Sequence, residues 1–251
     1  MGQGSVGQLE LQLTASLAFL VAVMGCATGY NRGEMNAALQ SAKPTYVSSD
    51  LSVEDIERMK PQLKLPARIA IAPPIQADQR WWGQDALSTW SPEEVAVLES
   101  WQEPLRAAGI ADELLVLPSA LVKDCEPRDA VCRLNAQRSA AARAHADALL
   151  IVNLATATDE YVNPASVLYI TIVGMWLVPA SHRDALTVAE GVLLDNRNEY
   201  LYAFARGEGE KKSIRPAMYA DTLAVVNASR VEALKSFGVA FLDQARQLSV
   251  K

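Results

Sequence analysis

The sequence is poor in the residues that build metal and catalytic sites, with two histidines and three cysteines among 251 residues. It also has no positive excess: 23 Lys and Arg stand against 29 Asp and Glu, a net charge of −6 that argues against electrostatic binding of nucleic acid. It has no Gly-x-Ser-x-Gly elbow, no glycine-rich phosphate loop and no His-Glu-x-x-His motif. His145 and His182 lie far apart, in a predicted helix and a predicted turn. These absences predict a protein that is not an enzyme and that binds no metal, cofactor or nucleic acid.

The N-terminus is typical of an export signal. Residues 13–25 carry no charge, and this stretch is too short to cross a bilayer but matches the apolar part of a secretory signal. Residues 1–12 depart from that pattern because they contain no Lys or Arg. We expect residues 1–25 to be a signal peptide; the alternative is a buried apolar helix.

Cys26 follows Val23, Met24 and Gly25, a spacing that resembles the bacterial lipobox. This resemblance implies that Cys26 is lipidated and becomes the first residue of the mature chain. Ala27 follows it, which by the same resemblance implies the outer membrane. Three acyl chains make such an anchor effectively permanent.

The rest of the chain divides into a tether and one α/β domain. Residues 26–66 are rich in small and polar residues, with a short helix predicted after Ser52, because Asp55 stands three positions later. Residues 67–251 predict a single mixed β-sheet with packed helices, in the order β-α-β-α-β-β-β-α. We expect strands at 68–72, 114–117, 148–154, 186–194 and 200–205, helices at 91–109, about 127–146 and about 217–248, and a solvated strand end at 207–212.

Residues 161–181 form a 21-residue run without a charged side chain. Within it, residues 167–178 are dominated by strand-forming side chains and are apolar on both faces. We expect a further, buried strand there. The alternative is that a hairpin at about 167–194 inserts into a membrane.

Two groups of residues remain as candidate sites. In an exported protein, Cys125 and Cys132 predict a structural disulfide, with a redox-active pair as the alternative. Arg80, Trp81, Trp82 and Trp90 form an aromatic loop of a composition found at binding hot spots. The other interpretation of this loop is that it caps the end of the sheet.

The segments 163–174 and 178–184 resemble the central signature of the rhombotarget (rhombotail) bacterial lipoproteins. That resemblance implies export and a lipid anchor, and no established activity. Many members end in a glycine-rich, basic tail, which residues 247–251 lack. More distantly, the element order is similar to the periplasmic domain of the curli-secretion lipoprotein and to the TolB amino-terminal region, a likeness of topology that assigns no function.

Together these observations predict an outer-membrane-anchored, periplasm-facing lipoprotein that acts as a binding or assembly module. Its partners are the membrane, through the anchor, and either another envelope protein or a second copy of itself. The alternatives are an oligomeric secretion-channel subunit and, third, an envelope enzyme.

Overall fold

The computed structural model describes residues 52–74, 89–126 and 129–248. They form a five-stranded mixed sheet in the order β2-β1-β3-β4-β5, in which β1 is parallel to β2 and β3, and the β3–β4 and β4–β5 pairs are antiparallel. This confirms the predicted fold class, a single mixed sheet with packed helices. The strands are β1 Ala67–Ile71, β2 Ala111–Val116, β3 Ala148–Val162, β4 Ser181–Asp195 and β5 Leu201–Arg215; the helices are α3 Val53–Arg58, α4 Pro92–Ser100, α5 Gln102–Ala107, η2 Ser119–Leu121, α6 Ala130–Arg143, η3 Pro164–Ile170, α7 Ile172–Leu177, η4 Ala217–Tyr219 and α8 Thr222–Arg246.

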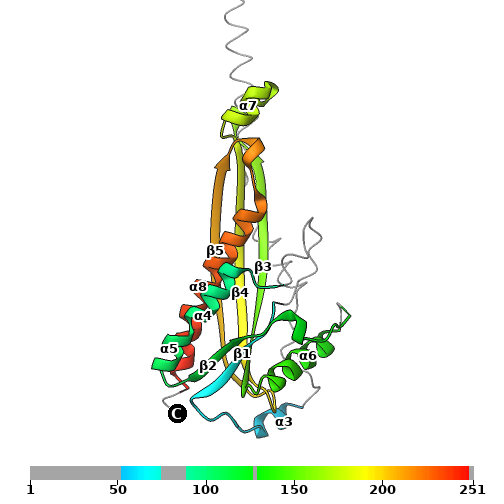
Figure 1. Cartoon of the computed structure of the whole chain (residues 1–251), viewed down its shortest axis with the longest axis vertical. Helices are drawn as coiled ribbons and strands as arrows, with labels where there is room; N and C mark the ends of the chain where they lie inside the picture. Colours follow the sequence, from blue (N-terminus) through cyan, green and yellow to red (C-terminus); the bar gives the residue numbers. More distant parts are fainter. Residues whose placement is uncertain (1–51, 75–88, 127–128, 249–251) are drawn as a thin grey trace, which may run out of the picture.

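Helices cover both faces of the sheet at its broad end (Figure 1). On one face, α4, α5 and α8 bury the side chains of Ile69 and Ile71 from β1 and Leu150 from β3. On the other face, α6 packs against Ala70 and Leu149. Because successive strand side chains point to opposite faces, β1 and β3 supply both layers of the core.

Three strands continue well past this core. β3, β4 and β5 have 15 residues each, whereas β1 has five, so the three-stranded meander extends from the body by itself. A 15-residue strand is about 50 Å long. Figure 1 shows α8 lying along this extension, with α7 at its far end.

Two glycines seat α8 on β5. A Cβ at Gly207 would lie 2.1 Å from the backbone nitrogen of Phe237, and one at Gly209 would lie 2.2 Å from the nitrogen of Ala233. The prediction of a solvated strand end at 207–212 is therefore wrong for the face that carries these glycines. The exposed charges Glu208 and Glu210 lie on the opposite face.

Local helix signals are confirmed. Ser91 and Glu94 form a capping box at the start of α4, and the Ser52 side chain accepts a hydrogen bond from the Asp55 backbone at the start of α3. The last residues of the predicted tether are held to the domain. There, the Tyr202 hydroxyl accepts hydrogen bonds from the backbone of residues 62 and 63.

Candidate functional site

The segment between β3 and β4 is helical, so the predicted strand over residues 167–178 is wrong. β3 continues to Val162, η3 and α7 follow, and β4 begins at Ser181. Most side chains of β4 are buried within the sheet and its covering layers. In the alternative interpretation, a hairpin at 167–194 inserts into a membrane; of those residues, only the helical connection is free to meet another surface.

Caps and one glycine explain why a β-branched sequence turns into helices here. The Asn163 side chain caps η3 by accepting from the Ala165 backbone at 3.0 Å, and Pro164 occupies the first helical position. Thr171 caps α7 by accepting from the Gly174 backbone at 3.0 Å. A Cβ at Gly174 would lie 1.9 Å from the carbonyl oxygen of residue 168, so only glycine fits.

The Tyr169 hydroxyl joins the two ends of the connection. It donates to the carbonyl oxygen of Val178 at 3.1 Å and accepts from the Ala180 backbone nitrogen at 3.0 Å. The Ser181 hydroxyl lies 3.2 Å away from it. Backbone groups that no strand partner reaches are thus bonded inside the connection itself.

A second segment reaches the same end of the molecule. The short helix η4 follows β5, and its Tyr219 ring meets the Trp176 ring of α7 edge to face, with ring centroids 5.6 Å apart. No motif in the sequence indicates that residues 217–219 would pack against residues 172–177.

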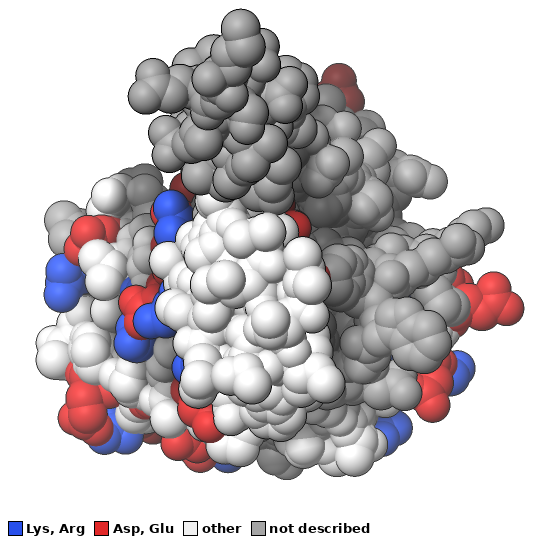
Figure 2. All heavy atoms as spheres, turned by 90° about the horizontal axis from the view of Figure 1, so that it is seen from above, with Lys and Arg blue, Asp and Glu red and all other residues white. Residues whose placement is uncertain are grey.

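Apolar side chains cover this end of the molecule, which we call the apolar tip. Eleven of the nineteen exposed large apolar side chains in the described part of the chain belong to it. Ile170 is 87% exposed and Ile172 is 75% exposed. Figure 2, which looks down on the tip, shows a surface without a charged side chain and with charges only at its margin. The members of the apolar tip are Val162, Val167, Leu168, Ile170, Ile172, Val173, Trp176, Leu177, Ile214, Met218 and Tyr219.

Directly below the tip, titratable side chains gather on one face of the three strands. The Tyr161 ring stacks on the His182 ring at 4.5 Å, and the Tyr161 hydroxyl donates to Asp184 at 3.4 Å. Asp159 and Lys212 stand opposite Asp184 in the neighbouring strands. Burial raises the pKa of Asp184 above its usual value, while Lys212 and His182 act in the opposite direction. His182 was predicted to lie in a turn, but it lies in β4.

Three hydroxyl groups form a hydrogen-bonded row within the extension, farther from the tip. The hydroxyls of Thr156 and Thr187 lie 2.8 Å apart, and that of Thr187 is 2.7 Å from the Ser229 hydroxyl of α8. Thr187 and Ser229 are fully buried, so these bonds satisfy groups that water does not reach.

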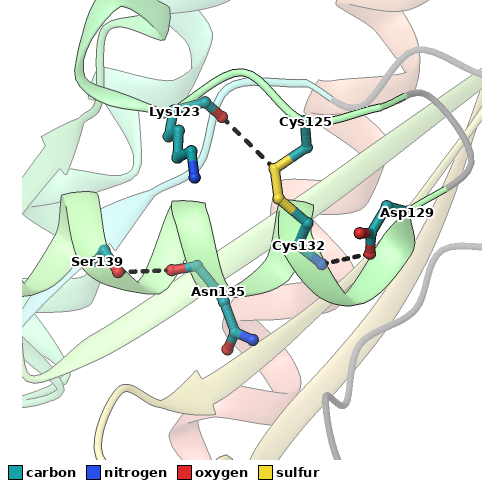
Figure 3. Close-up of a disulfide and its surroundings, with 6 residues drawn as sticks. All are labelled: Lys123, Cys125, Asp129, Cys132, Asn135 and Ser139. Carbon is teal, nitrogen blue, oxygen red and sulfur yellow. Dashed lines mark hydrogen bonds between the residues drawn. A yellow bond between two sulfur atoms is a disulfide. The ribbon is translucent and has the colours of Figure 1, made fainter.

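The Cys125–Cys132 disulfide is present in the structure and fastens a loop to the start of α6 (Figure 3). The two Cα atoms are 5.9 Å apart. The Asp129 side chain accepts from the Cys132 backbone nitrogen at 2.8 Å and caps the same helix. Helix α6, which contains Cys132, lies at the broad end of the molecule in Figure 1, away from α7, so the disulfide belongs to the body of the domain.

The aromatic loop is only partly within the described residues. Trp90 is 9% exposed and its indole nitrogen donates to the Ala72 carbonyl at 3.1 Å, so it is a core residue and its proposed role as a partner contact is wrong. Trp101 is also buried. Arg80, Trp81 and Trp82 lie outside the described residues, as do Cys26 and the predicted signal peptide.

The described residues contain no cluster of His, Cys, Asp and Glu that could hold a metal ion. Among the helices in these ranges, none has the length and apolar character needed to cross a bilayer.

Comparison with protein-family models and with curated proteins finds no match. Solved structures with distant likeness include lipoprotein GNA1162 from Neisseria meningitidis, at 17% identity over 64% of this chain and 90% of that chain, with a TM-score of 0.28. Protein XCC0632 of DUF330 from Xanthomonas campestris is 14% identical over 76% of this chain and 91% of its own, with a TM-score of 0.33. A PelC dodecamer from Paraburkholderia phytofirmans is 12% identical over 68% and 87%, with a TM-score of 0.25. Values this low assign neither a family nor a function, and membership of the rhombotarget lipoproteins stays a prediction.

Proposed function

We propose that this chain is a bacterial envelope protein that attaches to a membrane surface by inserting its apolar tip. The observation that carries the proposal is the tip itself, an uncharged and exposed apolar surface at the end of the three-stranded extension. Exposed apolar surface that is contiguous marks a site of contact with a protein or a membrane. These side chains are exposed and do not pack in the core of the domain.

The internal bonding of the tip supports a membrane as the contact. In hydrocarbon every unpaired backbone group costs several kcal/mol, so an inserting segment must satisfy its own hydrogen bonds. The side chains of Asn163, Tyr169 and Thr171 bond to backbone groups in the turns between β3, η3, α7 and β4. The tip thus directs apolar side chains outward and keeps polar groups inside, as an inserting element requires.

The order of side chains along the long axis also supports a membrane. Apolar residues form the end, and the aromatic residues Trp176 and Tyr219 lie among them. The first charges are Arg215, which stands opposite Ser181, and then the pair of Glu160 and Arg183, whose side chains lie 3.3 Å apart. Trp and Tyr favour the interface between hydrocarbon and headgroups. Because α7 has six residues and is about 9 Å long, the tip reaches into one leaflet and does not span.

This function fits the anchor expected at Cys26. A lipid on Cys26 would hold the chain to the outer membrane on its periplasmic side, and the tip would then set the orientation of the domain on a membrane. The other candidate binding partner of the tip is an apolar groove on another envelope protein. The second candidate function is that of an oligomeric channel subunit. Such a subunit would insert the same tip into the membrane, and strand β4 would stay outside it.

Vesicle flotation tests the proposal. Residues 26–251 with Cys26→Ala, a chain that lacks both the acylation site and the apolar segment expected to be part of the signal, are mixed with phosphatidylcholine vesicles and centrifuged through a density gradient. We expect this chain to float with the vesicles and to remain bound at high salt, because the contact is apolar and not electrostatic. Ile170→Asn with Ile172→Asn should lower the partition coefficient by about a hundredfold, since each burial contributes at least about 1.5 kcal/mol.

The chain offers a matched control. Phe204 and Val239 are each 64% exposed and lie outside the tip, so Phe204→Asn with Val239→Asn makes an equivalent change elsewhere. This control should float like the parent. A parent chain that stays at the bottom of the gradient, or a control that is lost with the tip variant, would contradict the proposal, and binding of the tip to an envelope protein alone would replace it.

A further inference from the structure

Asn163 closes the neck of the apolar tip, where β3 ends and β4 begins. Its backbone nitrogen donates to the Ala180 carbonyl at 2.9 Å. Its side-chain oxygen accepts from the Ala165 backbone at 3.0 Å, and its side-chain nitrogen donates to the Pro179 carbonyl at 3.3 Å. One residue therefore caps η3 and ties both stems of the tip together.

The same side-chain nitrogen lies 3.2 Å from Nε2 of His182. The bond from the Ala165 backbone fixes which end of the Asn163 amide is the oxygen, so the end that faces His182 is the NH2 group. An NH2 group only donates, and Nε2 must therefore accept. His182 is thus required to be neutral with its proton on Nδ1.

We propose that His182 is a pH-sensitive latch on the apolar tip, closed when its imidazole is neutral and opened when Nε2 takes a proton. In the charged imidazole both nitrogens are donors, so Nε2–H would face the NH2 group of Asn163 and the contact would be lost. The Tyr161 ring is stacked on His182 with an angle of 17° between the planes. This stacking restricts rotation of the imidazole, and Asn163 is the partner that must move.

The groups that face His182 come from all three strands. Tyr161 and Asp159 belong to β3, Asp184 to β4 and Lys212 to β5, and residues 163–180 of the tip carry no charge. The opening is therefore a property of this cluster, and Asp184 has to be controlled for in any test.

The consequence for membranes rests on the proposed function. When Asn163 leaves, the backbone nitrogen of Ala165 and the carbonyl of Pro179 lose their partners at the depth where the tip enters lipid. Unpaired backbone groups are unfavourable there. Acid should therefore weaken membrane binding, and neutral pH should strengthen it.

Amide hydrogen exchange on the full chain with Cys26→Ala, without lipid, tests the latch itself. Between pH 8 and pH 5, protection of residues 163–180, corrected for the intrinsic exchange rate, should fall by about tenfold, the typical effect of losing one hydrogen bond. His182→Gln offers an oxygen that accepts from Asn163 and does not titrate, so its protection should be independent of pH. Asp184→Asn should keep the pH dependence of the parent.

A measurement on the unmutated imidazole makes the test independent of variants. Nitrogen-15 shifts of His182 at pH 8 should report a proton on Nδ1 and none on Nε2. A proton on Nε2, or protection that does not change with pH in the parent, would overturn the latch, as would equal pH dependence in His182→Gln. Flotation at the two pH values separates the two proposals: loss of flotation at both, with the exchange response intact, contradicts only membrane insertion.

Discussion

Nε of Arg230 lies 2.5 Å from Oε1 of Glu94, in an ion pair whose side chains are 6% and 2% exposed. The second oxygen of Glu94 accepts from the Ser91 backbone at 2.8 Å and completes the capping box of α4. This pair ties α4, on the body of the domain, to α8, the helix that runs along the extension. It fixes the direction in which the tip is presented.

Breaking this ion pair should destabilise the whole domain. Arg230→Met leaves the Glu94 carboxylate buried without its partner, and such changes cost about 3–5 kcal/mol. Chemical denaturation monitored by circular dichroism measures the loss. The exposed pair of Lys235 and Glu232 is the control, because Lys235→Met should change the free energy of unfolding by no more than about 1 kcal/mol.

A methyl group at position 207 should separate α8 from β5. The Cβ of Gly207→Ala would meet the backbone of Phe237, which cannot rotate aside, and overpacking of this kind costs about 1–3 kcal/mol or more. The neighbouring exposed residue Glu208 serves as the comparison. If Gly207→Ala and Glu208→Ala melt at the same temperature, the close seat of α8 is wrong.

Opening the disulfide should have a moderate effect that stays local. The bond between Cys125 and Cys132 closes a loop of about eight residues, for which the chain-entropy estimate is about 2.5 kcal/mol. Cys125→Ser with Cys132→Ser should lower the stability by up to that amount and leave vesicle flotation unchanged. A loss of flotation in a folded double variant would mean that this loop contributes to the membrane contact.

The buried carboxyl below the tip should make stability depend on pH. Burial raises the pKa of Asp184, so the folded state binds a proton more readily than the unfolded chain does. Stability attributable to this residue is therefore highest below the unfolded-state pKa and falls as pH rises through the folded-state value. Asp184→Asn should raise the melting temperature at pH 7 and change it little in acid; the opposite order would show that Asp184 is stabilised as a carboxylate.

Much of the body of the domain could be predicted from local signals. The helix predicted over 91–109 begins at the capping box of Ser91 and Glu94, and the strands predicted over 68–72 and 148–154 are the apolar runs of β1 and β3. Both kinds of signal are contained within a few neighbouring residues. Trp90 could not be assigned in this way. Its burial depends on a bond to Ala72 in another element, and composition alone left two interpretations open, a cap on the sheet and a contact residue.

The extension and its tip were harder to predict because strand pairing is not local. β5 continues through the charged residues that follow Gly207 only because α8 packs against its glycines. In the tip, the β-branched residues favoured a strand, but in the described part of the chain no neighbouring strand pairs with them. The signals that decide are the caps at Asn163 and Thr171 and the glycine at 174, all of which are readable in the sequence.

Quenching of Trp176 fluorescence by brominated lipids tests membrane insertion most directly. The full chain with Cys26→Ala is bound to vesicles whose lipids carry bromine either near the headgroup or near the bilayer centre, and the signal of Trp176→Phe is subtracted to remove the other tryptophans. We predict strong quenching by bromine in the shallow position and weak quenching at the centre, as expected for an aromatic residue in one leaflet. Equal emission from Trp176 with and without brominated lipid would contradict insertion of the tip.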